Sequence, residues 1–176
     1  MNYLVHKSRR DGAYVTTENL VNADPSVRAP VALGPIDRVA IAAWKATWEL
    51  NPARSVDWDW ADYAAGYRRK RYARLELAIW SGDALCGFAL GKFSRAARVL
   101  QLNFIEGAPG NPLKGSVLWI AIAHGIILGS GYRAGLFRVT KPANHVQIAL
   151  SLLNPPFTYV AASAIAPYDY CERSLP

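Results

Sequence analysis

Residues 106–116 read EGAPGNPLKGS, and this stretch decides how the rest of the chain is interpreted. A β-like segment, RVLQLNFI at 98–105, runs directly into it, and an apolar segment, VLWIAIAHGIIL at 117–128, runs directly out of it. A plain connection needs one or two turn residues, whereas this one holds three glycines, two prolines and a lysine. The composition indicates a loop built to hold a ligand against the N-terminus of a helix.

The residue types in this loop suit an anionic ligand. The first turn of a helix has unpaired N–H groups and carries about half a positive charge. Gly115 lets a ligand approach the backbone because it has no Cβ, and Lys114 adds a mobile positive charge. The spacing is neither that of a P-loop nor that of the dinucleotide fingerprint. The sequence therefore predicts a pyrophosphate cradle of another kind.

Hydrophobic periodicity predicts the elements on either side of the loop. Helices are expected at 36–51, 57–74, about 115–128 and 144–154, and strands at 74–80, 84–93, 99–106, 136–140 and 157–166. Asp57 or Asp59 is expected to cap the second helix, and Asn144 the last one. Antiparallel hairpins come first and a β-α-β crossover second. This order predicts an α/β (α+β) fold with a mixed sheet flanked by helices on both faces.

The chain is interpreted as a single domain covering residues 1–176. Residues 1–35 are assigned to an N-terminal strand and loop, with GAYVTTENL at 12–20 as the strand. Residues 36–72 form a helical region, and residues 73–160 contain the sheet and the loop.

Bulk composition limits the class of protein. The chain has 52% hydrophobic and 19% charged residues, which favours a packed core over disorder. The net charge of +7 favours an anionic partner. Two cysteines and three scattered histidines do not form a metal set. The apolar run 117–128 is shorter than the roughly 20 residues that a membrane span needs, so a cytoplasmic protein with no membrane partner is expected.

Two segments resemble the GCN5-related N-acetyltransferase (GNAT) superfamily, together with the element order over about 36–160. NPLKGSV at 111–117 stands where the family has Q/R-x-x-G-x-G/A; Lys114 and Gly115 fit, and Val117 replaces the closing Gly/Ala. The segment 136–160 is similar to the family pattern N-x-x-A-x-x-L-Y-x-x-x-G-F, through Asn144, Leu150 and Phe157. Ser151 stands where many members carry a catalytic tyrosine.

The resemblance implies a GNAT-like, mostly antiparallel sheet and an N-acetyltransferase that moves an acetyl group directly from acetyl-CoA to a primary amine, without a metal. It implies Glu106 as the general base and places Ser151 at the position of the general acid. The cofactor-binding residues that it implies are Phe104, Ile105, Asn111, Leu113, Lys114, Gly115, Ser116 and Asn144.

Each of these roles has an alternative. Glu106 is either the base or a loop carboxylate, and Asn144 either touches the cofactor or only caps a helix. Tyr159 and Tyr168 are alternative proton donors to Ser151. His124, inside an apolar helix, is expected in the core.

Two further patches have two readings each. YRRKRYAR at 67–74 contains Arg68, Arg69, Lys70 and Arg71, which either bind nucleic-acid phosphates or complement a helix dipole. WDWADY at 58–63, with Trp44 and Trp48, either shapes an acceptor pocket or belongs to the core.

The alternative functions are a GNAT-fold enzyme that modifies a nucleobase or aminoacyl-tRNA, and a non-catalytic binding protein of the same fold. The acceptor amine is either a small molecule or part of a macromolecule, and a homodimer is possible.

Overall fold

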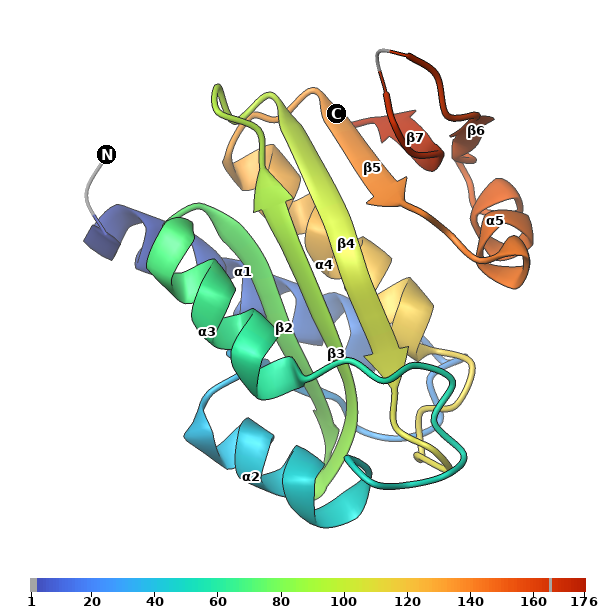
Figure 1. The fold of residues 1–176 in the computed structure, drawn as a ribbon. Helices are drawn as coiled ribbons and strands as arrows, with labels where there is room; N and C mark the ends of the chain where they lie inside the picture. Colours follow the sequence, from blue (N-terminus) through green and yellow to red (C-terminus); the bar gives the residue numbers. More distant parts are fainter. Residues whose placement is uncertain (1–2, 165) are drawn as a thin grey trace.

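The computed structural model describes residues 3–164 and 166–176, which form five helices and one seven-stranded sheet (Figure 1). The first half contains α1 (Tyr3–Asn22), β1 (Ala32–Gly34), α2 (Arg38–Thr47), α3 (Trp60–Lys70), β2 (Arg74–Ser81) and β3 (Ala84–Phe93). The second half contains β4 (Val99–Gly107), α4 (Val117–Gly131), β5 (Leu136–Thr140), α5 (Asn144–Ser151), β6 (Thr158–Val160) and β7 (Tyr170–Ser174).

The strands lie in the order β1-β2-β3-β4-β5-β7-β6. Within the described residues, β4 and β5 are the parallel pair and every other neighbouring pair is antiparallel. The sheet is therefore mixed and mostly antiparallel, as the sequence predicted. The meander of β2, β3 and β4 also lies where it was expected.

The parallel pair separates after a short contact. Val99 pairs with Leu136, and the register ends with Leu102 opposite Val139. β4 then continues to Gly107, while β5 turns away from it (Figure 1). The divergence begins next to an irregularity in β4, because Leu90 of β3 faces Phe104 and Gly91 faces Leu102, which leaves Asn103 without an opposite residue.

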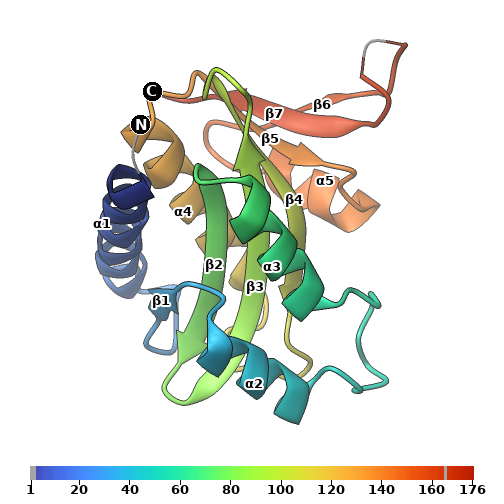
Figure 2. The same ribbon diagram turned by 60° about the vertical axis from the view of Figure 1, so that its left-hand side comes forward.

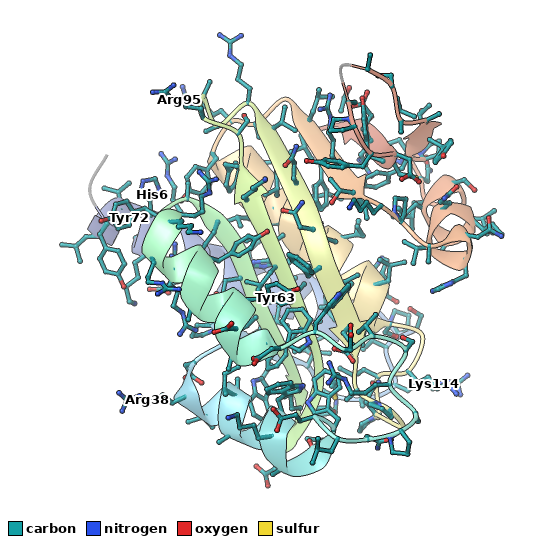
Figure 3. All side chains as sticks on the ribbon, in the orientation of Figure 1. His6, Arg38, Tyr63, Tyr72, Arg95 and Lys114 are labelled. Carbon is teal, nitrogen blue, oxygen red and sulfur yellow. The ribbon has the colours of Figure 1, made fainter. Side chains whose placement is uncertain are left out.

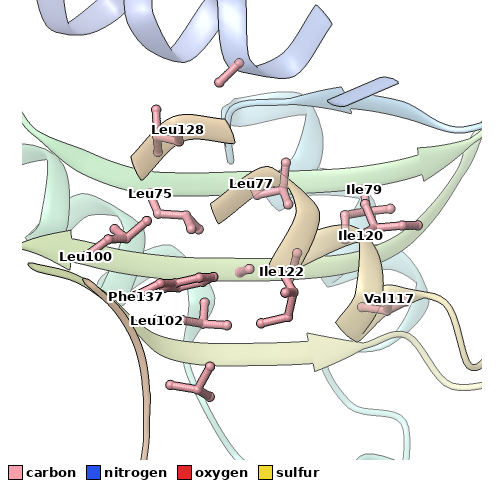
Figure 4. Packing of buried hydrophobic residues seen from close by; sticks show 14 of the residues in the cluster. Leu75, Leu77, Ile79, Leu100, Leu102, Val117, Ile120, Ile122, Leu128 and Phe137 are labelled. Atoms are coloured by element: carbon pink, nitrogen blue, oxygen red, sulfur yellow. The ribbon is translucent and has the colours of Figure 1, made fainter. Parts of the chain in front are cut away.

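Helices cover both faces of the sheet, with α1 and α4 on one face and α2 and α3 on the other (Figures 1 and 2). α4 is apolar around most of its circumference because it lies between the sheet and α1. Figure 4 shows its residues Val117, Ile120, Ile122 and Leu128 against those of the strands. This packing fixes where α4 begins, at the end of the 107–116 loop.

The predicted helix starts are close to the observed ones. Asp59 caps α3, since its Oδ1 accepts a hydrogen bond of 2.9 Å from the amide of Asp62. Asp37 caps α2 in the same way. The cap predicted for the last helix is wrong: Ala143 occupies that position without a side-chain hydrogen bond, and Asn144 is the first helical residue.

The strand predicted at residues 12–20 is also wrong, because this segment lies within helix α1. The buried face of α1 consists of His6, Arg10, Ala13, Tyr14, Thr17 and Val21. Half of that face is polar, so no apolar stripe at helical spacing is visible in the sequence. Residues 1 and 2, which the N-terminal assignment also included, lie outside the described residues.

The strand predicted at 157–166 is mostly wrong. Only Thr158–Val160 form a strand, and the missed strand β7 lies between β6 and β5. β7 reads YCERS, and Glu172 pairs with Arg138 of β5 at 2.8 Å. Its charges conceal the alternation typical of a strand. Residue 165 of the predicted strand lies outside the described residues.

His124 of α4 lies in the core, as predicted, and connects α4 to α1. It is fully buried, its ring stacks on Tyr14, and its Nδ1 lies 3.2 Å from Thr17 Oγ1. Burial lowers its pKa from 6.5 to about 3. The imidazole therefore stays neutral in the folded protein at pH values where the unfolded chain is protonated.

We predict an acid-sensitive contribution to stability from His124. Below pH 6.5 the unfolded state binds a proton at this residue and the folded state does not, so its contribution is present above pH 6.5 and is lost as the pH falls towards 3. Urea unfolding from pH 7 to pH 4 should show that His124→Leu lowers the slope of unfolding free energy against pH by about 1.4 kcal/mol per pH unit. The exposed residue His145 provides the control, since His145→Leu should leave the slope unchanged.

Candidate functional site

The loop between β4 and α4 is organised by its own asparagine. Asn111 Nδ2 donates a hydrogen bond of 2.6 Å to the Ala108 carbonyl, and its Oδ1 accepts one of 2.9 Å from the Leu113 amide. The Ala108 amide donates to the Cys86 carbonyl of β3 at 2.8 Å, which ties the loop to the sheet. The loop is therefore held open by internal bonds and needs no ligand to define its course.

Gly115 turns the chain into α4 with a φ of +89°, in the left-handed region that glycine adopts without strain. A Cβ built on it would meet nothing within 4 Å, so the space beside it is free. That space belongs to a cavity of about 390 Å³ lined by the loop, Val117 and Ala53. Because the first-turn amides of α4 have no intrahelical acceptor, this end of the helix favours an anion.

The structure places three of the predicted cofactor residues, Asn111, Lys114 and Gly115, in the wall of this cavity, which we call the loop cavity. Lys114 is exposed (Figure 3). Leu113 differs, since its side chain is only 2% exposed and packs in the core. Ser116 precedes α4, and its side chain makes no capping hydrogen bond.

A chain of hydrogen bonds crosses the point where β4 and β5 separate. Tyr67 Oη donates to Asn103 Oδ1 at 3.0 Å, and Asn103 Nδ2 donates to Thr140 Oγ1 at 2.9 Å. Thr140 Oγ1 in turn donates to the Leu102 carbonyl at 3.2 Å. Burial raises the pKa of Tyr67 to about 12, so its hydroxyl remains protonated at neutral pH. This chain of hydrogen bonds cannot be recognised in the sequence, because Tyr67, Asn103 and Thr140 form no local motif.

Phe104 and Ile105 point to opposite faces of the sheet. Ile105 packs against the core under α4, whereas Phe104 belongs to the α3 side. The Phe104 ring stacks on Tyr63 at 4.6 Å and makes edge contacts with Trp58 and Tyr67. These aromatic residues form a partly exposed wall beside the end of β4.

Glu106 lies at the end of β4, as expected, and both of its carboxylate oxygens are occupied. Arg54 Nε donates to Oε1 at 2.7 Å and Arg54 Nη2 donates to Oε2 at 2.9 Å, which makes the pair bidentate. Trp60 Nε1 also donates to Oε2, at 2.6 Å. The Glu106 side chain is only 4% exposed, and these three donors occupy both of its oxygens.

Arg54 uses its remaining donors on the segment between α2 and α3. Nη1 donates to the Glu49 carbonyl and Nη2 to the Trp58 carbonyl, each at 2.9 Å. The hydrogen bond to Glu106 raises the pKa of Arg54, so the guanidinium stays charged. One side chain therefore holds both ends of this segment to the end of β4.

The same segment encloses a second cavity, of about 600 Å³, which we call the segment cavity. Its lining residues include the acidic Glu49, Asp57 and Asp59, the aromatic Trp44 and Trp58, and Arg54, whose charge is paired with Glu106. Trp44 is only 1% exposed, and its Nε1 has no hydrogen-bond partner among the described residues. An acidic and aromatic wall of this kind suits a cationic ligand.

No protein-family model and no curated protein sequence matches this chain. Solved structures do match it. One is a putative acetyltransferase, yncA from Salmonella typhimurium with acetyl-CoA; its sequence identity is 13% and its TM-score 0.59, and the match covers 83% of this chain and 94% of that one. Another is the ribosomal-protein-S18-alanine N-acetyltransferase of Escherichia coli, with 12% identity and a TM-score of 0.57, matched over 83% of this chain and 93% of that one. A third is Mycobacterium smegmatis RimJ in complex with CoA-disulfide (17%, 0.56, 84% and 82%).

The chain has the GNAT fold. At these identities the likeness concerns the fold alone. It confirms the fold that the resemblance implied, and two of the structures named above contain acetyl-CoA or CoA-disulfide.

Several residues that the GNAT resemblance implied lie away from both cavities. Ser151 ends α5, is exposed, and donates to the Ile148 carbonyl at 2.8 Å. Asn144 is exposed at the first turn of α5, and neither residue lines the loop cavity or the segment cavity. Tyr159 is likewise exposed, and Tyr168 lies under the ammonium group of Lys141.

Residues 3–164 and 166–176 contain no group of side chains able to hold a metal ion. None of their helices combines the length and the apolar character that a membrane crossing requires.

We predict that the bond from Trp60 to Glu106 stabilises the GNAT fold measurably. Trp60→Phe keeps an aromatic ring but leaves a buried carboxylate without one donor. It should therefore lower the free energy of unfolding by about 1.5–3 kcal/mol more than a change that removes volume alone. Trp48→Phe is the matched control, because Trp48 is also buried against Phe88 and its Nε1 has no partner among the described residues. Equal losses of unfolding free energy in the two variants would contradict the prediction.

Proposed function

We propose that this protein is an acyl-CoA-dependent N-acyltransferase that moves an acetyl group to a primary amine. The observation that carries the proposal is the open loop cavity at the N-terminus of α4, at the end of the strand β4 that has separated from β5. The fold supports it, since N-acetyltransferases share this architecture.

In this proposal the pyrophosphate lies in the loop cavity. The first-turn amides of α4 and the Lys114 ammonium group face its charge, and the left-handed turn at Gly115 leaves the approach free of a Cβ. When bound, acetyl-CoA supplies a thioester that an amine can attack. The β4 edge beyond Leu102 has no pairing with β5, so the amide of Phe104 or Ile105 that points to this edge is available to the thioester carbonyl oxygen.

The acceptor amine enters from the α2–α3 side in this proposal. Glu49, Asp57 and Asp59 attract a cation, and the aromatic wall of Trp58, Tyr63 and Phe104 continues towards the gap. An ammonium group must lose a proton before it attacks, and in this proposal that proton passes to water. The free amine then attacks the thioester carbon, and CoA leaves as the thiol with the second amine proton.

We propose that Glu106 acts mainly as a positioning residue. Its ion pair with Arg54 fixes the α2–α3 segment, which forms the acceptor side, and its oxygens are already engaged. This differs from the general-base role implied by the family resemblance, and kinetics separate the two roles.

Ligand binding tests the cofactor site. Gly115→Glu places a carboxylate in the loop cavity, and titration calorimetry with acetyl-CoA and CoA should show affinity lower by at least about tenfold, or 1.4 kcal/mol. Gly82→Glu is the control, because it adds the same charge at another glycine with a positive φ. Gly82 lies in the β2–β3 turn, outside the wall of the loop cavity. Failure of the unaltered protein to bind either ligand would refute the proposed function and favour a non-catalytic binding protein.

Steady-state kinetics on a panel of amines test the role of Glu106. If it positions the segment, Glu106→Gln and Arg54→Lys should both raise the KM for the amine, because each breaks the bidentate pair. In both variants kcat should still fall towards acidic pH, as is expected of the unaltered protein. Loss of that pH dependence in Glu106→Gln alone, with a fall in kcat of about 100-fold or more, would establish the base role instead.

A further inference from the structure

Unpaired cations gather at the end of the sheet opposite the loop cavity. The register places Arg74 opposite Lys92, Phe93 opposite Leu100 and Val99 opposite Leu136, so the end of α3, the β3–β4 turn and the start of β5 meet at one edge. The exposed cations of this edge are Arg69, Lys70, Arg71, Arg95, Arg98 and Arg133. We call them the basic edge. Figure 3 shows Arg95 at the upper left and Lys114 at the lower right.

No carboxylate within the described residues forms an ion pair with a member of the basic edge. Two other arginines of the segment 67–74, Arg68 and Arg74, do form ion pairs. Arg68 donates to Glu76 Oε1 and to the Ile36 carbonyl, and Arg74 donates to Glu76 Oε2. Arg68, for which the sequence left phosphate binding and a helix-dipole complement open, is thus engaged by Glu76 and Ile36, while its three exposed neighbours form no ion pair within the described residues.

An aromatic platform lies beside these cations. Tyr72 follows Arg71, the C-cap of α3, and is 61% exposed, and Tyr3 of α1 meets its ring edge-on with the ring centroids 6.3 Å apart. The buried Arg10 donates to the Tyr72 carbonyl at 2.8 Å, and His6 stacks under the Tyr72 ring. The backbone of Tyr72 is therefore fixed from below while its ring faces outward.

We propose that the basic edge and Tyr72 bind a single-stranded nucleic acid. The guanidinium groups of Arg69, Arg71, Arg95 and Arg98 match phosphate oxygens, and the exposed Tyr72 ring offers a surface on which a base can stack. Cations interleaved with an exposed ring are the combination that single strands require, because phosphates and bases alternate along them.

An anionic lipid surface fits these residues less well. Membrane-surface helices combine cations with a continuous apolar face that enters the lipid. The exposed side of α1 instead carries Lys7 paired with Asp11 at 2.6 Å, between its apolar residues. The basic edge is also assembled from turns and helix ends, so it has no single helical face to insert.

The basic edge is separate from the proposed acyl-transfer site. α3 extends from Trp60, which donates to Glu106 at the end of β4, to the basic edge at Lys70, a length of about 16 Å at 1.5 Å per residue. A strand bound at the basic edge therefore leaves the loop cavity open. Binding of nucleic acid and binding of acetyl-CoA can be tested independently.

The test is fluorescence anisotropy with a labelled single-stranded RNA of about 20 nucleotides, over salt concentrations from about 50 to 300 mM. The unaltered protein should bind, with log K falling linearly with log salt. Arg69→Gln, Lys70→Gln and Arg71→Gln combined should weaken binding about tenfold or more and reduce the salt slope by about 2, at roughly 0.7 per lost phosphate contact. Arg95→Gln with Arg98→Gln, on a different element, should act in the same direction.

The control is the triple variant Arg28→Gln, Arg38→Gln and Lys45→Gln, which removes three exposed cations outside the basic edge. Both triple variants change the net charge from +7 to +4, so a general charge effect would weaken them equally. Tyr72→Ala should weaken binding without changing the salt slope, because it removes stacking alone.

Equal loss in both triple variants, no RNA binding at about 50 mM salt, or binding of anionic phosphatidylserine vesicles in preference to RNA would overturn the proposal. Acetyl-CoA affinity measured on the same variants should stay unchanged. A basic-edge variant that loses RNA but keeps acetyl-CoA separates this inference from the proposed function.

Discussion

The bidentate ion pair between Arg54 and Glu106 is the constraint on which the site depends. It joins the end of β4 to a segment that has no regular structure of its own, and Trp60 adds a third donor from the start of α3. Two buried charges are costly unless they are paired and hydrogen-bonded. Here both oxygens of Glu106 accept hydrogen bonds, and Arg54 also donates to two backbone carbonyls. The strand end, the segment and the helix start are thus fixed together, and both cavities derive their shape from that arrangement.

Much of the fold was predictable because the core elements follow simple periods. β2, β3, β4 and β5 carry β-branched and other apolar residues with short turns between them, and α4 is a long apolar run behind a glycine-rich loop. α1 was not predictable in this way. Its buried face uses His6, Arg10 and Thr17, whose partners Tyr132, Tyr72 and His124 are distant in the sequence. β7 was missed for a related reason, since its charges are satisfied across strands.

The residues of the candidate site also differ in whether the sequence could predict them. The loop could be predicted because Asn111, Lys114 and Gly115 are neighbours in the chain. Glu106 was located correctly at the end of β4, but its partners could not be identified, because Arg54 and Trp60 are 52 and 46 residues away. The chain from Tyr67 through Asn103 to Thr140 spans three elements and has no local signature. Sequence therefore indicates residues that act through their neighbours along the chain, and not those that act through tertiary contacts.

One feature of the α2–α3 segment links the two cavities. Ala53 belongs to the wall of the loop cavity, and Arg54, the next residue, belongs to the wall of the segment cavity. Ligands on the two sides would thus contact consecutive residues of one chain segment, a shared partition that Arg54 holds to the end of β4. A ligand that tightens the partition from one side changes the affinity on the other, and thermodynamic linkage makes that influence equal in both directions. Occupancy of either cavity would then change the affinity of the other by the same factor, whichever ligand binds first.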